Sequence, residues 1–188
     1  MSWHVTSNEI DKWSSSHTRD AQEKLPFLIK KLIMATVEPK YIHIPSGDSI
    51  LTGGWDGELI VDKGNTFIPD NKSVWEFGTN ININKKAEND YQKRTNNSSD
   101  TNISYIFATT KTWAKKSNFE EEKNKENKWK EVRGINSDDL ELWLTLAPAV
   151  HRWFANLIGK RPLNSLDIEQ SFENWSSGNP PIFQPLQK

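Results

Sequence analysis

The segment Lys72-Ser73-Val74-Trp75-Glu76-Phe77-Gly78-Thr79 is the most strand-like stretch of the sequence. Its β-branched and aromatic residues favour a strand of the central sheet. A side-chain period of two places Val74, Glu76 and Gly78 on one face, and Trp75 and Phe77 on the other. A carboxylate in a half-buried strand costs several kcal/mol unless it is paired or binds a cation. The segment therefore predicts a strand, and a Glu76 that is either paired or bound to a cation.

The residues on either side of this strand predict an α/β fold. Residues 7–36 are predicted to form a short helix and then, from about Thr18, a longer one whose apolar residues recur at spacings of three and four. A charged helix is expected at about 84–95. Further strands are predicted at residues 41–45, 55–61 and 103–109. The order is helix, three strands, helix, strand, which predicts a mixed central sheet flanked by helices.

The remaining third of the chain predicts one more strand and two more helices. Residues 117–130 are dense in charge and are either a solvated helix or a mobile insert. Residues 131–135 predict a strand, and Ser137 is expected to cap the helix that follows. A second helical segment starts at Pro148, with Gly159 as a plausible stop.

Composition limits the classes of protein that fit. The 188 residues suit one domain, and the absence of cysteine excludes disulfides and Cys-ligated metal sites. No apolar run is long enough to cross a bilayer, so we expect a soluble cytoplasmic protein that does not contact a membrane. With 24 Lys and Arg against 25 Asp and Glu, the net charge is -1. Any contact with nucleic acid must therefore come from local basic patches.

Asp56 and Glu76 are the candidate metal ligands. Asp56 begins the strand that precedes the Glu76 strand, and neighbouring strands can bring two carboxylates close together. Such an oxygen-rich pair is typical of Mg²⁺ sites that keep several waters. The bound ion could polarise a phosphodiester oxygen and generate hydroxide near neutral pH. The chemistry also needs a positive group for the charge that develops on phosphorus.

The helix after the Glu76 strand offers that positive charge. Lys86, Asp90 and Arg94 follow one another at spacings of four, which places them on one helical face, and Lys85 lies beside Lys86. An ordinary surface ladder of ion pairs explains the same spacing. An isolated Asp-Gly before a strand, as at Asp56, is likewise common in turns without any metal.

Three stretches of the sequence resemble a known family. They are Gly54-Trp55-Asp56-Gly57, then Pro69 with Ser73-Val74-Trp75-Glu76-Phe77-Gly78-Thr79, and Lys86-Ala87-Glu88-Asn89-Asp90-Tyr91-Gln92-Lys93-Arg94-Thr95. Together they resemble the PD-(D/E)XK, or restriction-endonuclease-like, nuclease domain. More narrowly, they are similar to its Mrr-like version at the N-terminus of bacterial antiviral STAND NTPases. The resemblance covers about residues 5–160, and the element order predicted above is that of the family's common core.

The resemblance implies a metal-dependent DNA endonuclease. In it Asp56 and Glu76 would hold Mg²⁺, with Mn²⁺ able to substitute. One departure matters, because the family's lysine two residues after the acid is replaced by Gly78. Related enzymes supply that charge from the next helix, which makes Lys86 the expected catalytic lysine and Lys85 the alternative.

The resemblance also implies partners and a domain layout. Double-stranded DNA is the expected substrate, cut with little sequence preference, with Lys85, Lys93 and Arg94 as candidate DNA contacts. Residues 1–159 would be the nuclease domain, and residues 160–188 a linker or extension toward an NTPase domain. In the parent type, the nuclease is the effector of an anti-phage defence protein and is activated by homo-oligomerisation.

Two other functions compete with this one. A domain that kept the fold and lost the chemistry would serve as an interaction or oligomerisation module. Alternatively, the nine tryptophans could stack on sugars, with Asp56 and Glu76 as glycosidase carboxylates. Catalysis by serine or histidine has little support, because no nucleophile or zinc motif and no phosphate-binding loop is present.

Overall fold

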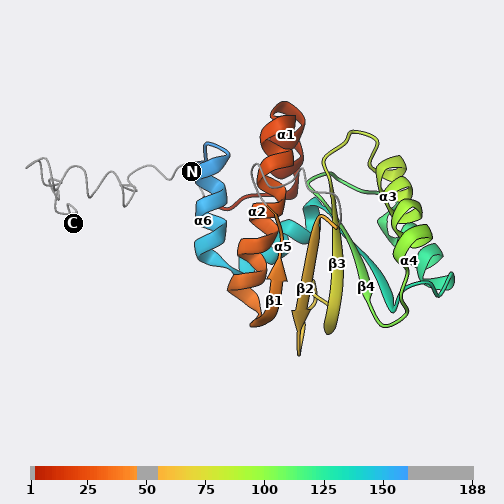
Figure 1. The fold of residues 1–188 in the computed structure, drawn as a ribbon. Coiled ribbons are helices and arrows are strands. Elements are labelled where there is room, and N and C mark those ends of the chain that lie inside the picture. The colour runs from red at the N-terminus through yellow and green to blue at the C-terminus, as the bar shows by residue number, and fades with distance from the viewer. Residues whose placement is uncertain (1–2, 46–54, 161–188) are drawn as a thin grey trace, which may run out of the picture.

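The structure, a computed structural model, describes residues 3–45 and 55–160. In these residues five strands form one mixed sheet in the order β1-β2-β3-β4-β5 (Figure 1). The strands are β1 (Pro39–His43), β2 (Gly57–Val61), β3 (Asn71–Gly78), β4 (Ser104–Thr109) and β5 (Glu131–Ile135). β1, β2 and β3 pair antiparallel as a meander, whereas β4 and β5 extend the sheet in parallel from β3. The predicted α/β class and mixed sheet are confirmed.

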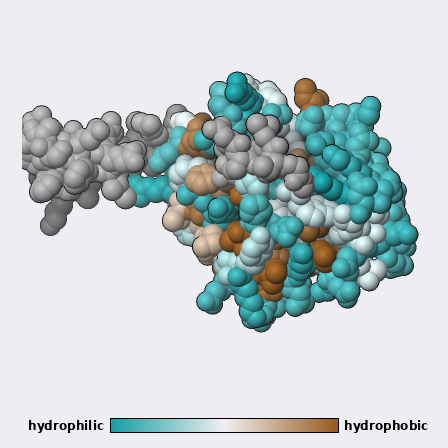
Figure 2. All heavy atoms as spheres, viewed as in Figure 1, coloured by the Kyte–Doolittle hydropathy of each residue, from teal (hydrophilic) through white to brown (hydrophobic). Residues whose placement is uncertain are grey.

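Helices cover both faces of this sheet. They are α1 (Ser7–Ser16), α2 (Thr18–Thr36), α3 (Ile83–Ser98), α4 (Lys116–Lys125), α5 (Ser137–Leu146) and α6 (Pro148–Leu157). The helices α1, α2, α5 and α6 pack on one face, and α3 and α4 on the other (Figure 1). The outer surface over α3 and α4, at the right of Figure 2, is mostly hydrophilic. The predicted order of helix, three strands, helix, strand is also confirmed.

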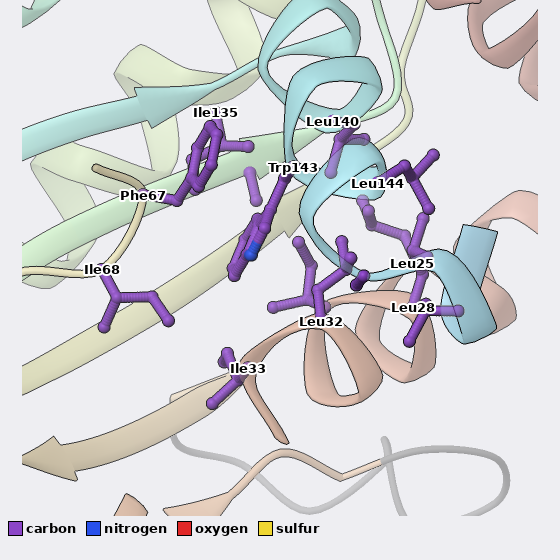
Figure 3. Close-up of a cluster of buried hydrophobic side chains, with 14 of the residues drawn as sticks. Leu25, Leu28, Leu32, Ile33, Phe67, Ile68, Ile135, Leu140, Trp143 and Leu144 are labelled. Carbon is purple, nitrogen blue, oxygen red and sulfur yellow. The ribbon is translucent and has the colours of Figure 1, made fainter. Parts of the chain in front are cut away.

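The larger apolar core lies between the sheet and the four-helix layer. Leu25, Leu28 and Leu32 of α2 meet Trp143 and its neighbours on α5 (Figure 3). The Trp143 ring stacks on Phe67 with centroids 5.0 Å apart and planes 12° apart. Its indole N–H donates a hydrogen bond to Thr36 Oγ1 over 3.0 Å, so the polar atom of this large buried side chain is satisfied.

A second apolar core fixes the face on which Glu76 lies. Val74 of β3 packs with Tyr105 and Phe107 of β4 under Ala87 and Tyr91 of α3. Trp75, by contrast, belongs to the larger core on the opposite face. This alternation confirms the period of two that was predicted for the strand. Glu76 therefore faces α3, the helix that carries the candidate lysines.

A few boundaries differ from those predicted. The cap of α5 is Asn136 and not Ser137, because Asn136 Oδ1 accepts the Asp139 N–H while the Asp139 carboxylate accepts the Asn136 N–H. The charged residues 117–130 resolve into helix α4 and a turn, so the helical alternative holds. Gly159, with φ of 78°, follows α6 as the predicted stop.

Parts of the predictions lie outside the described residues. The proposed linker begins at residue 160, and its residues 161–188 are not among those described; the same is true of Gly54 in the first stretch of the family resemblance. Among the helices that the structure does describe, none is both long enough and apolar enough to cross a bilayer.

Candidate active site

The sheet register brings Asp56 and Glu76 to the same point. Gly57 of β2 pairs with Trp75 of β3 in antiparallel register, so Asp56, one residue earlier, comes opposite Glu76. Asp56 Oδ2 accepts a hydrogen bond from the Phe77 N–H over 3.0 Å, which holds the carboxylate against β3. Asp56, the residue before β2, therefore lies close enough to Glu76 of β3 for its charge to act on that carboxyl group.

Glu76 is buried, and its surroundings disfavour the ionised form of its carboxyl group. The residue is 3% exposed. Burial, and next the negative charge of Asp56, raise the pKa of Glu76 to about 7, against the opposing effect of Arg94. Near neutral pH the carboxyl group is thus divided between its protonated and ionised forms. A strongly shifted carboxyl beside a second acid at a pocket is a pattern typical of functional sites.

Arg94 of α3 reaches back to this carboxylate. Its Nε donates a hydrogen bond to Glu76 Oε1 over 2.5 Å, and its Cζ lies 4.9 Å from the centroid of the Trp55 ring. The guanidinium is thus held between a carboxylate and an aromatic face. Arg94 was predicted to contact DNA. In this arrangement its Nε is a partner of Glu76, and its contact with DNA stays a prediction.

Lys86 and Asp90 form the second ion pair of the site. Lys86 Nζ donates to Asp90 Oδ1 over 3.0 Å and lies 2.8 Å from Oδ2. Burial raises the pKa of Asp90 in spite of this partner. The predicted shared face of Lys86, Asp90 and Arg94 is therefore present. It is not the surface ladder considered above, because its pairs are partly buried and Arg94 bonds to the strand.

Gly78 leaves the space that the Lys86 side chain uses. A Cβ placed on Gly78 would lie 3.1 Å from Lys86 Cγ and 2.7 Å from Phe107 Cζ. The strand position at which the resembled family carries its lysine is thus covered by the stem of a lysine from α3. Any side chain at position 78 would have to displace that stem or the Phe107 ring.

A pocket of about 280 Å³ opens at this point, and we call it the carboxylate pocket. Its lining includes Trp55, Asp56, Phe77, Gly78 and Lys86. Glu76 is buried and is not part of that lining. Among the described residues, the pocket is therefore lined by one acid, Asp56, and one lysine, Lys86, whose ammonium group has Asp90 as its ion-pair partner.

The other predicted cations lie farther out. Lys85 and Lys93 are both exposed. Lys85 lines a second hollow that adjoins the carboxylate pocket, whereas Lys93 lines neither of the two. Of the predicted residues, the structure thus brings together Asp56, Glu76, Lys86 and Arg94, with Lys85 nearby.

The residues present fit a magnesium ion bound by few protein ligands. Within residues 3–45 and 55–160, no group of three or more His, Cys, Asp or Glu side chains is arranged to hold a metal. Mg²⁺, however, is commonly bound through one or two carboxylates with water and substrate oxygens. Asp56 and Glu76 supply such a pair, and a bound cation would offset both the burial and the repulsion by Asp56 that raise the Glu76 pKa.

Sequence reasoning missed three features of this site. Trp55 was read only as a neighbour of Asp56, and its contact with Arg94 has no local signal. Tyr105 is buried on the adjacent strand, and its hydroxyl has no hydrogen-bond partner. Burial, and to a smaller extent the charges of Glu76 and Asp90, raise the pKa of Tyr105 well above its usual range. Thr79, directly after β3, is buried with its hydroxyl unpaired and lines the carboxylate pocket.

Comparison with known proteins identifies no relative: no family model, no curated protein and no solved structure matches the chain.

Proposed function

We propose that this domain is a Mg²⁺-dependent endonuclease that hydrolyses phosphodiester bonds in double-stranded DNA. One observation carries the proposal: Asp56, directly before β2, lies near Glu76 of β3, and Glu76 is buried with a pKa of about 7. The Lys86 stem, lying over Gly78, supports it further. The role proposed for each of these residues follows from the resemblance to PD-(D/E)XK nucleases.

Asp56 and Glu76 are the proposed ligands of the divalent ion. When bound, the ion supplies Lewis-acid charge and a more acidic water. Lys86 places an ammonium group at the pocket, where it stabilises the negative charge that develops on a phosphate oxygen. Asp90 orients that ammonium group through the 3.0 Å hydrogen bond. Arg94 neutralises Glu76 and must share or release it when the ion binds.

The setting proposed for this activity follows the resemblance. The substrate is DNA bound through phosphates with little base specificity, and Lys85 and Lys93 are the exposed candidates for those contacts. The domain would act in the cytoplasm as the effector of a larger anti-phage defence protein, and oligomerisation of that protein would activate it.

Plasmid digestion tests the proposal. Purified protein is incubated with supercoiled plasmid in Mg²⁺, Mn²⁺ or EDTA, and Glu76→Gln and Asp56→Asn are compared with the wild type. We expect nicking or linearisation with either metal and none in EDTA, and a loss of at least about 100-fold in each variant. Glu88→Gln is the matched control, because it removes an acid of α3 that pairs with Lys123 outside the site.

An interaction or oligomerisation module is the second candidate. The observation that favours it is the pairing of the site's own charges: Arg94 holds Glu76 and Lys86 holds Asp90, as expected where no metal binds. Isothermal titration with Mn²⁺ separates the two functions. Binding that is abolished by Glu76→Gln supports the nuclease. Absence of both binding and cleavage at high protein concentration supports the module.

A further inference from the structure

The chain leaves β3 for α3 at one end of the sheet (Figure 1). A second hollow, lined by residues of this connection, adjoins the carboxylate pocket. Its volume is about 400 Å³. We call it the basic cleft, and its walls include Thr79, Asn80, Asn82, Lys85, Lys86 and Lys111. Among the described residues that line it there are three lysines and neither Asp nor Glu. Thr79 and Lys86 belong to both hollows.

Thr79 gives the cleft an unsatisfied hydroxyl. The residue is 3% exposed, and its Oγ1 has no hydrogen-bond partner. Most buried polar side-chain atoms are paired, so an orphan at the wall of a hollow calls for an explanation. A threonine hydroxyl can donate a hydrogen bond to an anionic oxygen. A ligand with such an oxygen in the cleft would satisfy Thr79.

The first turn of α3 carries positive side chains, whereas negative ones are favoured at a helix N-terminus. Its first turn includes Lys85 and Lys86 and no acid, although the positive end of the helix dipole favours Asp or Glu. The Lys85 N–H is capped by Asn82 Oδ1 over 3.2 Å. The positive end of the helix dipole repels these lysine side chains. An anion bound at the helix N-terminus would offset that repulsion.

Lys111 is the third lysine of the cleft lining, and its ammonium group is held by side chains of α1. It is buried, and its Nζ donates to Ser15 Oγ over 2.7 Å and to Asp11 Oδ1 over 3.4 Å. Asp11, which also accepts the Thr112 N–H over 3.0 Å, is the counter-ion of Lys111. The cleft thus combines the exposed Lys85, the N-terminus of α3 and the unpaired Thr79 hydroxyl.

We propose that the basic cleft binds a phosphate group, held by Lys85, Lys111, the first turn of α3 and the Thr79 hydroxyl. The site is distinct from the carboxylate pair and does not depend on hydrolysis. Two sources share this chemistry. One is a phosphodiester of a DNA strand that continues from the carboxylate pocket, and the other is the phosphomonoester of a free nucleotide.

Binding measurements in EDTA test the proposal without cleavage. A short fluorescein-labelled duplex is titrated by fluorescence anisotropy at several salt concentrations. AMP is titrated by ¹H–¹⁵N NMR, following the backbone amides of residues 83–86. The test variants are Thr79→Val and Lys85→Gln. Thr110→Val is the matched control, because Thr110 is also buried with an unpaired hydroxyl but is not part of the cleft lining. Lys128→Gln controls for the loss of one exposed positive charge.

We expect Thr79→Val to weaken binding about tenfold, as for a lost hydrogen bond to a charged group. Lys85→Gln should weaken duplex binding. It should also reduce the slope of the logarithm of the binding constant against the logarithm of the salt concentration by about one. Urea unfolding should show Thr79→Val to be as stable as the wild type, since no hydrogen bond is lost in the free protein. Both controls should bind like the wild type.

The outcome with each probe identifies the source. Weaker binding of the duplex by the two test variants assigns the cleft to a DNA phosphodiester. Weaker binding of AMP alone assigns it to a free nucleotide. If the test variants bind both probes as the controls do, the proposal is overturned. If the protein cleaves plasmid but Thr79→Val does not change binding, only the proposal of phosphate binding in the basic cleft is refuted. If the protein binds through the basic cleft but does not cleave plasmid, only the proposed nuclease activity is refuted.

Discussion

The burial of Glu76 predicts a loss of stability with rising pH that Glu76→Gln removes. The carboxyl group is buried, and burial, followed by the charge of Asp56, raises its pKa from 4.5 to about 7. The folded protein therefore binds this proton more tightly than the unfolded chain does. The contribution of Glu76 to stability is greatest below pH 4.5, falls as the pH rises from 4.5 to 7, and is level above that range.

The size of the effect follows from the shift. Each pKa unit corresponds to about 1.4 kcal/mol, so the free energy of unfolding loses up to about 3 kcal/mol through ionisation of Glu76. Glutamine has the shape of the protonated acid and cannot ionise. The variant should therefore match the wild type near pH 4.5 and be more stable by about 2–3 kcal/mol at pH 8.

Urea unfolding in EDTA, followed by tryptophan fluorescence, measures this difference at pH 4.5, 6, 7 and 8. Comparing variant with wild type cancels the titration of all other groups. Glu88→Gln is the control of opposite sign: burial of Glu88 opposes ionisation, but hydrogen bonds from Lys123 and Gln92 outweigh it and lower its pKa. If the difference for Glu76→Gln does not change with pH, Arg94 keeps Glu76 ionised throughout, and the reasoning fails.

Three further substitutions test the packing around the site. Gly78→Ala should cost about 1–3 kcal/mol in urea unfolding, since the new methyl group would lie 2.7 Å from Phe107 Cζ. The same change should slow any cleavage by displacing Lys86. Unfolding like that of the wild type would contradict this prediction and show that the strand relaxes. Trp143→Ala should cost about 3–5 kcal/mol in the same assay, because the ring is fully buried, and a loss below 1 kcal/mol would contradict the core described. Asn136→Ala should cost about 1 kcal/mol in thermal unfolding through loss of the α5 cap, whereas an equal loss from Ser137→Ala instead would return the cap to Ser137.

Local patterns predicted the elements of this fold well. Alternation along residues 72–79 predicted β3 and its two faces, because a strand turns successive side chains to opposite sides whatever surrounds it. The spacing of apolar residues in α2 likewise predicted the face that packs in the core. The position of a helix cap was less certain, because Asn136 and Ser137 are adjacent residues that both cap well, and only the bonds to Asp139 distinguish them.

The sequence by itself determined the order of strands and helices, and it singled out Asp56, Glu76 and Lys86 as candidate site residues. Only the tertiary structure decided how those side chains are paired. The hydrogen bond from Phe77 to Asp56, the bond from Arg94 to Glu76 and the meeting of Lys111 with Ser15 join residues 18 to 96 positions apart. Such contacts depend on how the sheet brings its layers together, and no spacing along the chain encodes that distance.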